Sequence, residues 1–374
     1  MSEMEQERPL VSVGIMTYNH AKYIVKALDS VIMQEVNFKY EIVIAEDCST
    51  DGTREIVIEY QKKYPDIIRL LLHEKNLGMK ENSNILRRSC RGIYRANLEG
   101  DDYWIDPCKL QKQVDFLENN KDYVAVGGNF TCVDDYGKPT AFPWGDITYT
   151  YCFDDEYTIE HFKRWLLFAH TSTMMFRNFF YDCGEEINKR FDEVNMLGDR
   201  RICLFLVLKG RVRHIDETWI VRRVLRKSKT SMTNAVRTSN YLWTNYGWML
   251  EAERYSREQF SYKLDLGEKK AQRWLGSIKV FVRSPNKENL DAVKYIFLHS
   301  NRKMLYIGKA FIKSITKTNS LFKEIGVKKG VVRILKKGKF VLNSTKNGLS
   351  STPVRKDSAA KSVLESYSQG NNIR

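Results

Sequence analysis

Three acidic side chains lie within four positions of one another. Glu99, Asp101 and Asp102 are followed directly by the large aromatic residues Tyr103 and Trp104. Carboxylates this close repel one another, and a cation bound between them relieves the repulsion. Oxygen ligands suit hard divalent cations such as Mg²⁺ and Mn²⁺, which also bind phosphate groups. The acids alone would favour a solvated acidic turn. Together with the adjacent aromatic residues and the polar ends of two other predicted strands, they favour a metal-bound diphosphate.

The elements that must position these acids alternate between strand and helix patterns. Short apolar runs predict buried strands, and apolar residues spaced three and four apart predict amphipathic helices between them. This alternation with short links predicts an α/β fold with a mostly parallel sheet covered by helices. The predicted strands are 9–18, 40–47, 67–73, 92–100 and 123–130, and the predicted helices are 21–34, 49–64, 80–90 and 107–120, the last capped by Asp106.

Polar residues follow three of these strands at the point where each strand ends. They are Thr17, Tyr18 and Asn19 after the first strand, Glu46 and Asp47 after the second, and residues 99–102 after the fourth. In open parallel sheets, ligands bind beyond the carboxyl ends of the strands. We therefore expect a ligand site at this edge of the sheet.

The pattern becomes less regular after residue 134. It predicts a strand at 170–176, a helix at 199–210 and mainly helical structure beyond residue 239. We therefore expect three parts: an α/β catalytic domain at 1–238, a helical and basic region at 239–343, and a tail at 344–374. The tail is rich in Ser, Asn, Gly and Lys, a composition typical of disorder.

Four segments, in order, resemble the family-2 inverting glycosyltransferases of the GT-A fold. They are residues 11–34, 41–53, 76–84 and 97–118, and the resemblance extends over about residues 8–226. It implies a GT-A fold with a mostly parallel central sheet, flanking helices and a helical C-terminal region. It also implies transfer of a sugar from a nucleotide-diphosphate donor in the synthesis of a bacterial cell-surface polysaccharide.

The resemblance also implies roles for individual residues. Thr17 and Tyr18 match positions that contact the base and ribose, and Asp47 matches the acid that pairs with the uracil edge. Asp101 matches the ribose-side acid, Asp102 matches the metal ligand, and both are candidates to hold Mg²⁺ or Mn²⁺. The family often has Asp-x-Asp-Asp where this chain has Glu99-Gly100-Asp101-Asp102. The predicted nucleotide-sugar contacts are Thr17, Tyr18, Asn19, Glu46, Asp47, Asn76, Glu99, Asp101 and Arg223.

Asp199 is the candidate catalytic base. Gly198-Asp199 before the predicted helix resembles the family's base segment. Direct displacement at an anomeric carbon needs a carboxylate that deprotonates the acceptor hydroxyl. The alternative is that Asp199 only caps the helix and interacts with its dipole.

The segment 218–234 resembles a family loop, usually Tyr-Arg-x-His, that closes over the diphosphate. Arg223 matches its Arg, whereas Arg222 replaces the Tyr and Leu225 replaces the His. Guanidinium groups bind phosphate oxygens well, and the alternative is a solvated basic loop. His170 lies where the family has acceptor-site residues, with a structural histidine as the alternative.

The net charge of +15 is concentrated near the C-terminus. Residues 301–346 carry thirteen Lys and Arg against one acidic residue, Glu324, and lysines alternate there with apolar residues. Such a segment can lie on an anionic membrane surface. The alternative is a helix that packs on the catalytic domain with its basic face in solvent.

Other features bear on the cellular compartment. The seven cysteines form no Cys-x-x-Cys pair, which favours reduced thiols over a disulfide framework or a zinc site. The polar N-terminus is unlike a signal peptide, and no run of 18 apolar residues occurs. We expect a cytoplasmic protein that binds peripherally to the inner face of the membrane.

The sequence thus predicts an inverting, metal-assisted transferase that moves a sugar, with UDP-sugar as the expected donor, to a hydroxyl of a glycan or lipid-linked acceptor. A nucleotidyltransferase would usually have a Gly-rich loop after the first strand, which is missing here. A nucleic-acid partner is not expected, because the basic residues lie outside the α/β half and no nucleic-acid-binding motif occurs. A non-catalytic family member that serves as a partner subunit remains an alternative, given the departures at Glu99 and Leu225.

Overall fold

The computed structural model describes five stretches of the chain, residues 8–141, 156–182, 184–225, 241–284 and 286–299. The chain divides into two compact units at residue 325, and all of these stretches belong to the first unit. The predicted boundaries after residues 238 and 343, the basic segment 301–346 and the tail 344–374 lie outside them. Those predictions stay untested.

A nine-stranded mixed sheet forms the centre of the described part, in the order β3-β2-β1-β4-β8-β6-β9-β5 with β7 beside β9. Strands β3, β2, β1 and β4 pair in parallel with one another, and β6 also pairs in parallel with β9. The short strands β5, β7 and β8 run antiparallel to their neighbours. The strands are β1 Val11–Thr17, β2 Tyr40–Glu46, β3 Ile68–Leu72, β4 Tyr94–Glu99, β5 Tyr103–Trp104, β6 Tyr123–Val133, β7 Glu156–Tyr157, β8 Met175–Arg177 and β9 Arg211–Arg223.

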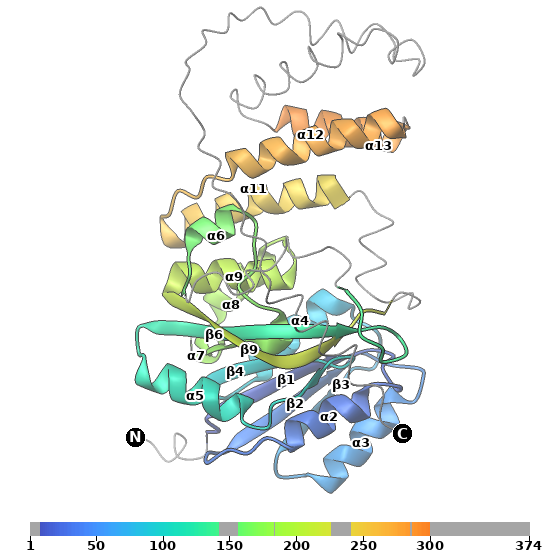
Figure 1. The fold of residues 1–374 in the computed structure, drawn as a ribbon, viewed down its shortest axis with the longest axis vertical. Coiled ribbons are helices and arrows are strands. Elements are labelled where there is room, and N and C mark those ends of the chain that lie inside the picture. Colours follow the sequence, from blue (N-terminus) through green and yellow to red (C-terminus); the bar gives the residue numbers. More distant parts are fainter. Residues whose placement is uncertain (1–7, 142–155, 183, 226–240, 285, 300–374) are drawn as a thin grey trace, which may run out of the picture. The chain divides into compact units, whose positions relative to one another are not determined.

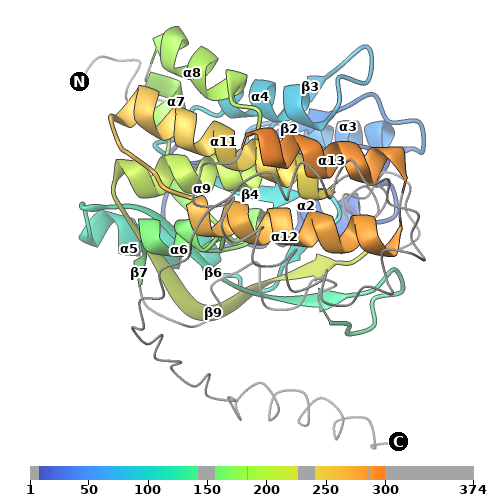
Figure 2. The same cartoon turned by 90° about the horizontal axis from the view of Figure 1, so that it is seen from above.

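Helices cover both faces of this sheet, which confirms the predicted α/β fold (Figures 1 and 2). Helices α2, α3 and α5 lie on one face, and α4 and α9 lie on the other. The helices of this part are α2 Ile24–Ile32, α3 Thr53–Lys63, α4 Met79–Ser89, α5 Lys109–Asn119, α6 Ile159–Lys163, α7 Phe179–Asp182, α8 Gly184–Glu193 and α9 Gly198–Lys209, with a 3₁₀ turn, η2, at Thr171–Thr173.

The central strands are apolar because both of their faces are covered. Val13, Ile15, Ile42 and Ile44 have no exposed surface, as expected for parallel strands between two helix layers. Helix α2 packs against these strands with an apolar stripe, which includes Leu28. Burial of these side chains holds the strand ends at a fixed edge, where the polar residues follow.

Helix α5 begins two residues later than predicted. The Asp106 carboxylate accepts a hydrogen bond from the Cys108 N–H at 2.8 Å, but the first helical residue is Lys109. The Gln34 side chain donates to the Asp106 carbonyl at 2.7 Å and accepts from the Leu110 N–H at 3.0 Å. Hydrogen bonds from Gln34, a residue distant in sequence, therefore replace the expected first turn of the helix.

The predicted strand at 170–176 is mostly wrong. Residues Thr171–Thr173 form η2, and only Met175–Arg177 form a strand, β8. The Thr171 and Ser172 hydroxyls donate to Glu99 and Asp102, respectively. These bonds to acids distant in sequence hold the turn.

The predicted helical structure beyond residue 239 is present in the part that is described. Helices α11 Tyr241–Phe260, α12 Gly267–Arg283 and α13 Lys287–Leu298 follow one another. Met249 of α11 belongs to the main core, and the Phe260 ring lies 6.0 Å from the Phe205 ring of α9. Tyr246 of α11 packs instead with Trp274 and Ile296 in a second cluster. No helix among those described is both long enough and apolar enough to cross a bilayer.

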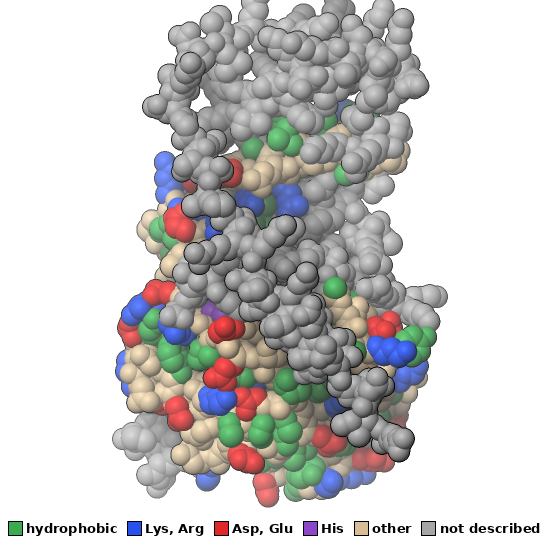
Figure 3. Space-filling model, viewed as in Figure 1, with side chains coloured by type: hydrophobic (Ala, Val, Ile, Leu, Met, Phe, Trp, Pro, Cys, Tyr) green, Lys and Arg blue, Asp and Glu red, His purple; other side chains and the backbone are tan. Residues whose placement is uncertain are grey.

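One face of the α/β part shows no concentration of basic side chains. On the face drawn in Figure 3, acidic, basic and apolar side chains are interspersed over the α/β part. This agrees with the assignment of much of the chain's positive charge to residues 301–346.

Substitution of Gly128 by Ala should destabilise the fold. Gly128 lies at a register irregularity between β6 and β9, and a Cβ there would come within 2.7 Å of the Trp219 ring and 2.8 Å of the Glu217 carbonyl. Trp219 is fully buried, so we expect a loss of about 1–3 kcal/mol in the free energy of unfolding, measured by urea denaturation. The control Gly247→Ala, in α11 with no neighbour within 4 Å, should be neutral or stabilising. Equal unfolding midpoints for Gly128→Ala and the wild type would contradict this packing.

Candidate active site

The loops after β1 and β2 are joined by hydrogen bonds. The Asn19 N–H donates to the Ser49 hydroxyl at 2.9 Å, and the Asn19 side-chain oxygen accepts from the Thr50 N–H at 2.9 Å. The His20 N–H donates to the Thr53 hydroxyl at 2.8 Å. Asn19 has a φ of 56°, in the left-handed region that Asn tolerates better than most residues. Hydrogen bonds therefore connect the ends of the two strands, and the side-chain oxygen of Asn19 takes part in this connection.

The carboxylates after β2 bind protein groups. Glu46 has no exposed surface, accepts from the Ser49 N–H at 2.6 Å and pairs with Arg54 at 2.5 Å. Asp47 accepts from the N–H groups of Leu77 and Gly78 at 2.7 and 3.0 Å. The geometry thus gives Glu46 and Asp47 a role in loop structure, and their predicted contacts with a nucleotide stay predictions.

Asn76 lies at the same edge, as predicted. Its side-chain amide donates to the Asp47 carbonyl at 3.1 Å, so the segment after β3 is fixed to the end of β2. Thr17 is buried with its hydroxyl 3.3 Å from His20 Nδ1, whereas Tyr18 is partly exposed. The structure therefore brings the predicted residues of the first three strand ends together.

The acidic cluster after β4 contains three different environments. Asp102 is 3% exposed, and its carboxylate accepts from the Ser172 hydroxyl and the Arg223 N–H, both at 3.0 Å. Glu99 accepts from the Thr171 hydroxyl at 2.8 Å. Asp101 is partly exposed, and its carboxylate has no hydrogen bond or ion pair with any residue that the structure describes. Asp101 is thus the member of the cluster with its oxygens available to a ligand.

Repulsion within the cluster raises the pKa values of two of its carboxyl groups. Burial raises the pKa of Asp102 well above its usual value, and the charges of Asp101 and Glu99 raise it further. Burial and the charge of Asp101 likewise raise the pKa of Glu99. The Arg222 charge lowers both pKa values but does not offset the increase. A cation at this point would stabilise the ionised carboxylates.

Asp199 lies near this cluster. Its charge contributes to the raised pKa of Glu99, although 100 residues separate the two in sequence. Asp199 is in the first turn of α9, where Leu197 occupies the N-cap position, and its carboxylate accepts from the Arg200 N–H at 2.6 Å. The predicted start of this helix is confirmed within one residue. The carboxylate is partly exposed, and its hydrogen bond to the Arg200 N–H holds it at the start of the helix.

Two residues of η2 hold the acidic cluster and were missed by sequence reasoning. Besides its bond to Asp102, Ser172 accepts from the Glu99 N–H at 3.3 Å, and its carbonyl accepts from the Trp104 indole N–H at 2.9 Å. Thr171 binds the Glu99 carboxylate. The run of hydroxyl residues in a segment with a strand pattern was the one available signal.

His170 fits the structural alternative. It is 5% exposed, and its Nδ1 accepts from the Ser172 N–H at 3.3 Å. Nδ1 also lies 3.7 Å from the Asp102 carboxylate, but burial lowers the pKa of His170 well below its usual value. The ring is therefore neutral and does not form an ion pair with Asp102.

Arg223 is held between aromatic rings at the end of β9. Its guanidinium carbon lies 4.9 Å from the centre of the Tyr23 ring and 5.1 Å from that of Tyr103. Arg223 and Asp101 both lie close enough to Tyr23 to shift its pKa, which burial raises. No carboxylate pairs with the Arg223 side chain in the described part of the chain. An oriented guanidinium with unused donors suits phosphate oxygens.

Gly100 allows the loop after β1 to approach the acidic cluster. A Cβ at this position would come within 2.8 Å of both the Thr17 hydroxyl and His20 Nδ1. The Gly100 N–H donates to the Met16 carbonyl at 2.9 Å. The ends of β1 and β4 are therefore in direct contact.

The donor set fits a divalent cation that is shared with a ligand. Among the described residues, no group of three or more His, Cys, Asp or Glu side chains is arranged to hold a metal ion. Mg²⁺ in nucleotide sites usually takes only one or two carboxylates and completes its shell with phosphate oxygens and water. The free oxygens of Asp101 beside Glu99 meet that requirement.

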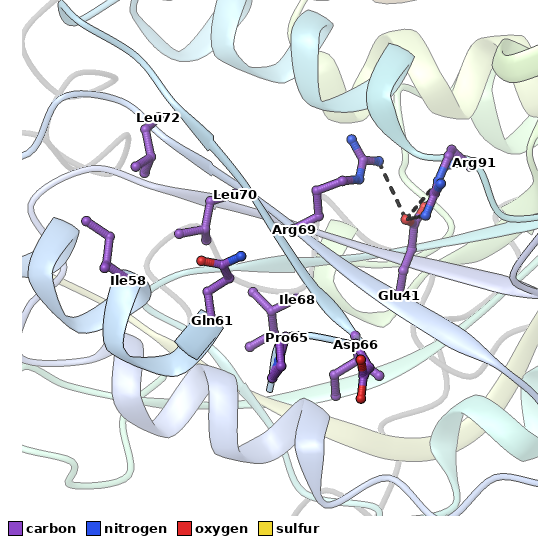
Figure 4. A pocket seen from close by; sticks show the side chains of 11 residues that line it. Glu41, Ile58, Gln61, Pro65, Asp66, Ile68, Arg69, Leu70, Leu72 and Arg91 are labelled. Carbon is purple, nitrogen blue, oxygen red and sulfur yellow. Dashed lines mark hydrogen bonds and ion pairs between the residues drawn. The ribbon is translucent and has the colours of Figure 1, made fainter. Parts of the chain in front are cut away.

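A separate pocket of about 690 Å³ lies along the edge strand β3 (Figure 4). Gln61 and Leu70 line it, and at one end the Glu41 carboxylate faces Arg69 and Arg91. Arg91 binds Glu41 at 2.9 Å. None of the predicted site residues lines this pocket, so it is not the candidate active site.

Comparison with known proteins identifies the class. Residues 12–184 match the family described as Glycosyl transferase family 2. An uncharacterised protein of Mycobacterium tuberculosis is 41% identical over 134 residues, which are 36% of this chain and 39% of that protein. A protein of Methanocaldococcus jannaschii named as an uncharacterised glycosyltransferase is 31% identical over 162 residues, 41% of this chain and 55% of that protein. The chain therefore spans only about half, or less, of the length of these relatives.

A solved structure confirms the fold. TarS 1-349 of S. aureus, crystallised in complex with UDP-GlcNAc, superposes with a TM-score of 0.57 at 17% identity. The superposition covers 79% of this chain and 83% of that one. At this identity the likeness shows the GT-A architecture and does not identify a substrate.

Loss of the Ser172 hydroxyl should weaken the cluster. Ser172→Ala leaves the buried Asp102 carboxylate without one of its two donors, so we expect a loss of about 1–3 kcal/mol in the free energy of unfolding by urea denaturation. Ser284→Ala, at an exposed position, is the matched control and should lie within about 0.5 kcal/mol of the wild type. If both variants unfold like the wild type, Ser172 does not hold Asp102.

Proposed function

We propose that the protein is an inverting glycosyltransferase that uses a nucleotide-diphosphate sugar, with a UDP-sugar as the expected donor. The observation that carries the proposal is the convergence at one edge of a GT-A sheet of the acidic cluster, Asp199 and the Arg223 guanidinium, which pairs with no described carboxylate. The family match of residues 12–184 supports the same reaction class.

The nucleotide would lie across the ends of β1, β2 and β4. Thr17 and Tyr18 would contact the base and ribose. They lie beside Asn19, which is hydrogen-bonded to the loop after β2. The diphosphate would lie between Asp101 and Arg223, because neither side chain forms a hydrogen bond or ion pair with a described residue and both lie near Tyr23. Arg223 would donate to the phosphate oxygens, and the two Tyr rings beside it restrict its orientation.

Asp101 is the better candidate to hold Mg²⁺ or Mn²⁺. Asp102 is buried and occupied by Ser172 and the Arg223 N–H, so its role in this proposal is to fix β9 and η2 around the site. The cation would neutralise charge that develops on the departing diphosphate. Asp101 presents the oxygens for it, with Glu99 beside them.

Asp199 would act as general base. Its carboxylate would accept the proton of the acceptor hydroxyl while that oxygen forms a bond to the anomeric carbon. The bond from the anomeric carbon to the diphosphate oxygen breaks on the opposite face, which inverts the configuration. The position of Asp199 near Glu99, at the end of a rigid helix, supports this role.

The acceptor proposed is a hydroxyl of a glycan or of a lipid-linked saccharide. The basic composition of residues 301–346 supports a further proposal, contact of that segment with an anionic membrane surface.

The two aspartates of the cluster can be separated by substitution. Asp101→Asn should weaken Mn²⁺-dependent binding of UDP roughly tenfold or more, because it removes an unshared charged ligand. Asp102→Asn, the matched control, should retain the Mn²⁺ dependence and change mainly the free energy of unfolding. Calorimetric titration with UDP measures the first effect, and urea denaturation the second. The reverse pattern would assign the metal to Asp102, as the sequence resemblance implied.

Asp199→Asn should separate binding from chemistry. Asparagine preserves the shape at the start of α9, so UDP affinity and stability should be nearly unchanged. Loss of the general base should lower kcat by about a hundred- to ten-thousand-fold in a sugar-transfer assay. More than about a tenth of wild-type turnover in this variant would show that Asp199 is only structural. Wild-type protein that binds UDP yet transfers no sugar to any acceptor would favour the partner-subunit alternative.

A further inference from the structure

Three buried arginines lie between the sheet and the helices on the α4 side. Arg87 of α4, Arg95 of β4 and Arg201 of α9 are only 3%, 6% and 4% exposed. Arg87 pairs with Asp192 at 2.5 Å, and Arg201 donates to the Asn84 side-chain oxygen at 3.2 Å. None of these groups takes part in the proposed reaction.

Arg95 has no polar partner among the described residues. Its Nε is fully buried without an acceptor, and its guanidinium makes no hydrogen bond or ion pair. The contact that it does make is with the Phe176 ring, 5.9 Å from the guanidinium carbon to the ring centre. A guanidinium stays charged in proteins and carries five N–H donors, so a buried one without acceptors is unusual.

The region carries a surplus of positive charge. Burial lowers the pKa of Arg87 to about 10, and the charges of Arg95 and Arg201 add to this effect. Burial also lowers the pKa of Arg95 and of Arg201. Asp192 is the carboxylate that opposes the shifts at Arg87 and Arg201, and it also pairs with the more exposed Arg88. The group that opposes the shift at Arg95 is the Cys90 thiol, so no carboxylate among the described residues offsets the Arg95 charge.

These arginines are connected to the candidate active site. Arg95, Asn97 and Glu99 alternate along β4, so they share one face of the sheet, with about 6.6 Å between successive members of the row. Asn97, in the middle, has a buried side-chain oxygen without a donor. Arg201 lies two residues after Asp199 at the start of α9. Asn97 and Arg95, each with a buried side-chain atom that lacks a described partner, therefore share the face of β4 on which Glu99 of the acidic cluster lies.

We propose that Arg95, with Arg87 and Arg201, forms a binding site for an oxyanion, a phosphate or carboxylate group. Because β4 carries both Arg95 and the acidic cluster, the ligand proposed for this site is a negatively charged group of a substrate, such as the carboxylate of an acidic sugar. That last step rests on the proposed function, whereas binding of an oxyanion does not.

The first experiment measures thermal unfolding of the full chain in inorganic phosphate at matched ionic strength. Phosphate should raise the Tm of the wild type by on the order of a few degrees, because a ligand bound only by the folded state stabilises it. Arg95→Met should fold, since it replaces an unpaired buried charge by an apolar side chain, and its Tm should not respond to phosphate. Arg88→Met, the same change at a 49% exposed position, should respond like the wild type.

The second experiment separates the sources of the oxyanion. Calorimetry with Mn²⁺ compares UDP, UDP-glucose and UDP-glucuronic acid on the wild type and on Arg95→Met. A substrate carboxylate at the site predicts tighter binding of UDP-glucuronic acid than of UDP-glucose by the wild type alone, with equal UDP affinity in both proteins. A phosphate response without this preference assigns the site to free phosphate. Failure of UDP itself to bind counts against the proposed function and leaves the phosphate result to decide the oxyanion site.

The absence of both the phosphate response and the acidic-sugar preference in the wild type would overturn the inference. An equal phosphate response in Arg95→Met would overturn it as well, because the anion would then bind elsewhere.

Discussion

The mutual repulsion of Glu99, Asp101 and Asp102 is the constraint on which the candidate site depends. Three carboxylates at one strand end are tolerated because two of them are bound by protein donors. Asp102 binds the Ser172 hydroxyl and the Arg223 N–H, and Glu99 binds the Thr171 hydroxyl. The third, Asp101, has no hydrogen bond or ion pair with the residues that the structure describes. The same arrangement that stabilises the fold therefore leaves one charge available to a cation.

The elements around the cluster follow from this constraint. Strand β8 enters the sheet between β4 and β6 and brings η2 against the acids. Strand β9 runs beside β6 and ends at Arg223, whose backbone N–H binds Asp102 while its side chain lies between two Tyr rings. Helix α9 begins near Glu99 and presents Asp199. Three segments far apart in sequence thus complete a site that β4 begins.

The sequence predicts the framework better than the site. Apolar runs and helical periodicity identify β1, β2 and β4 and the helices between them, because local burial determines those elements. The start of α5 depends on Gln34, and η2 depends on the distant acids Glu99 and Asp102, so local patterns miss both. The resemblance locates Asp101, Asp102 and Asp199 but cannot show which carboxylate already accepts hydrogen bonds from the protein. That distinction depends on the hydroxyls of Thr171 and Ser172, whose contacts with the acids are visible only in the three-dimensional structure.

Binding of UDP to the wild-type protein with and without Mn²⁺ tests the central claim most directly. If the free oxygens of Asp101 share a cation with a diphosphate, calorimetry should show UDP affinity that rises roughly tenfold or more with Mn²⁺ and falls again on addition of EDTA. UDP that does not bind, or that binds with the same affinity in EDTA as in Mn²⁺, would contradict the account.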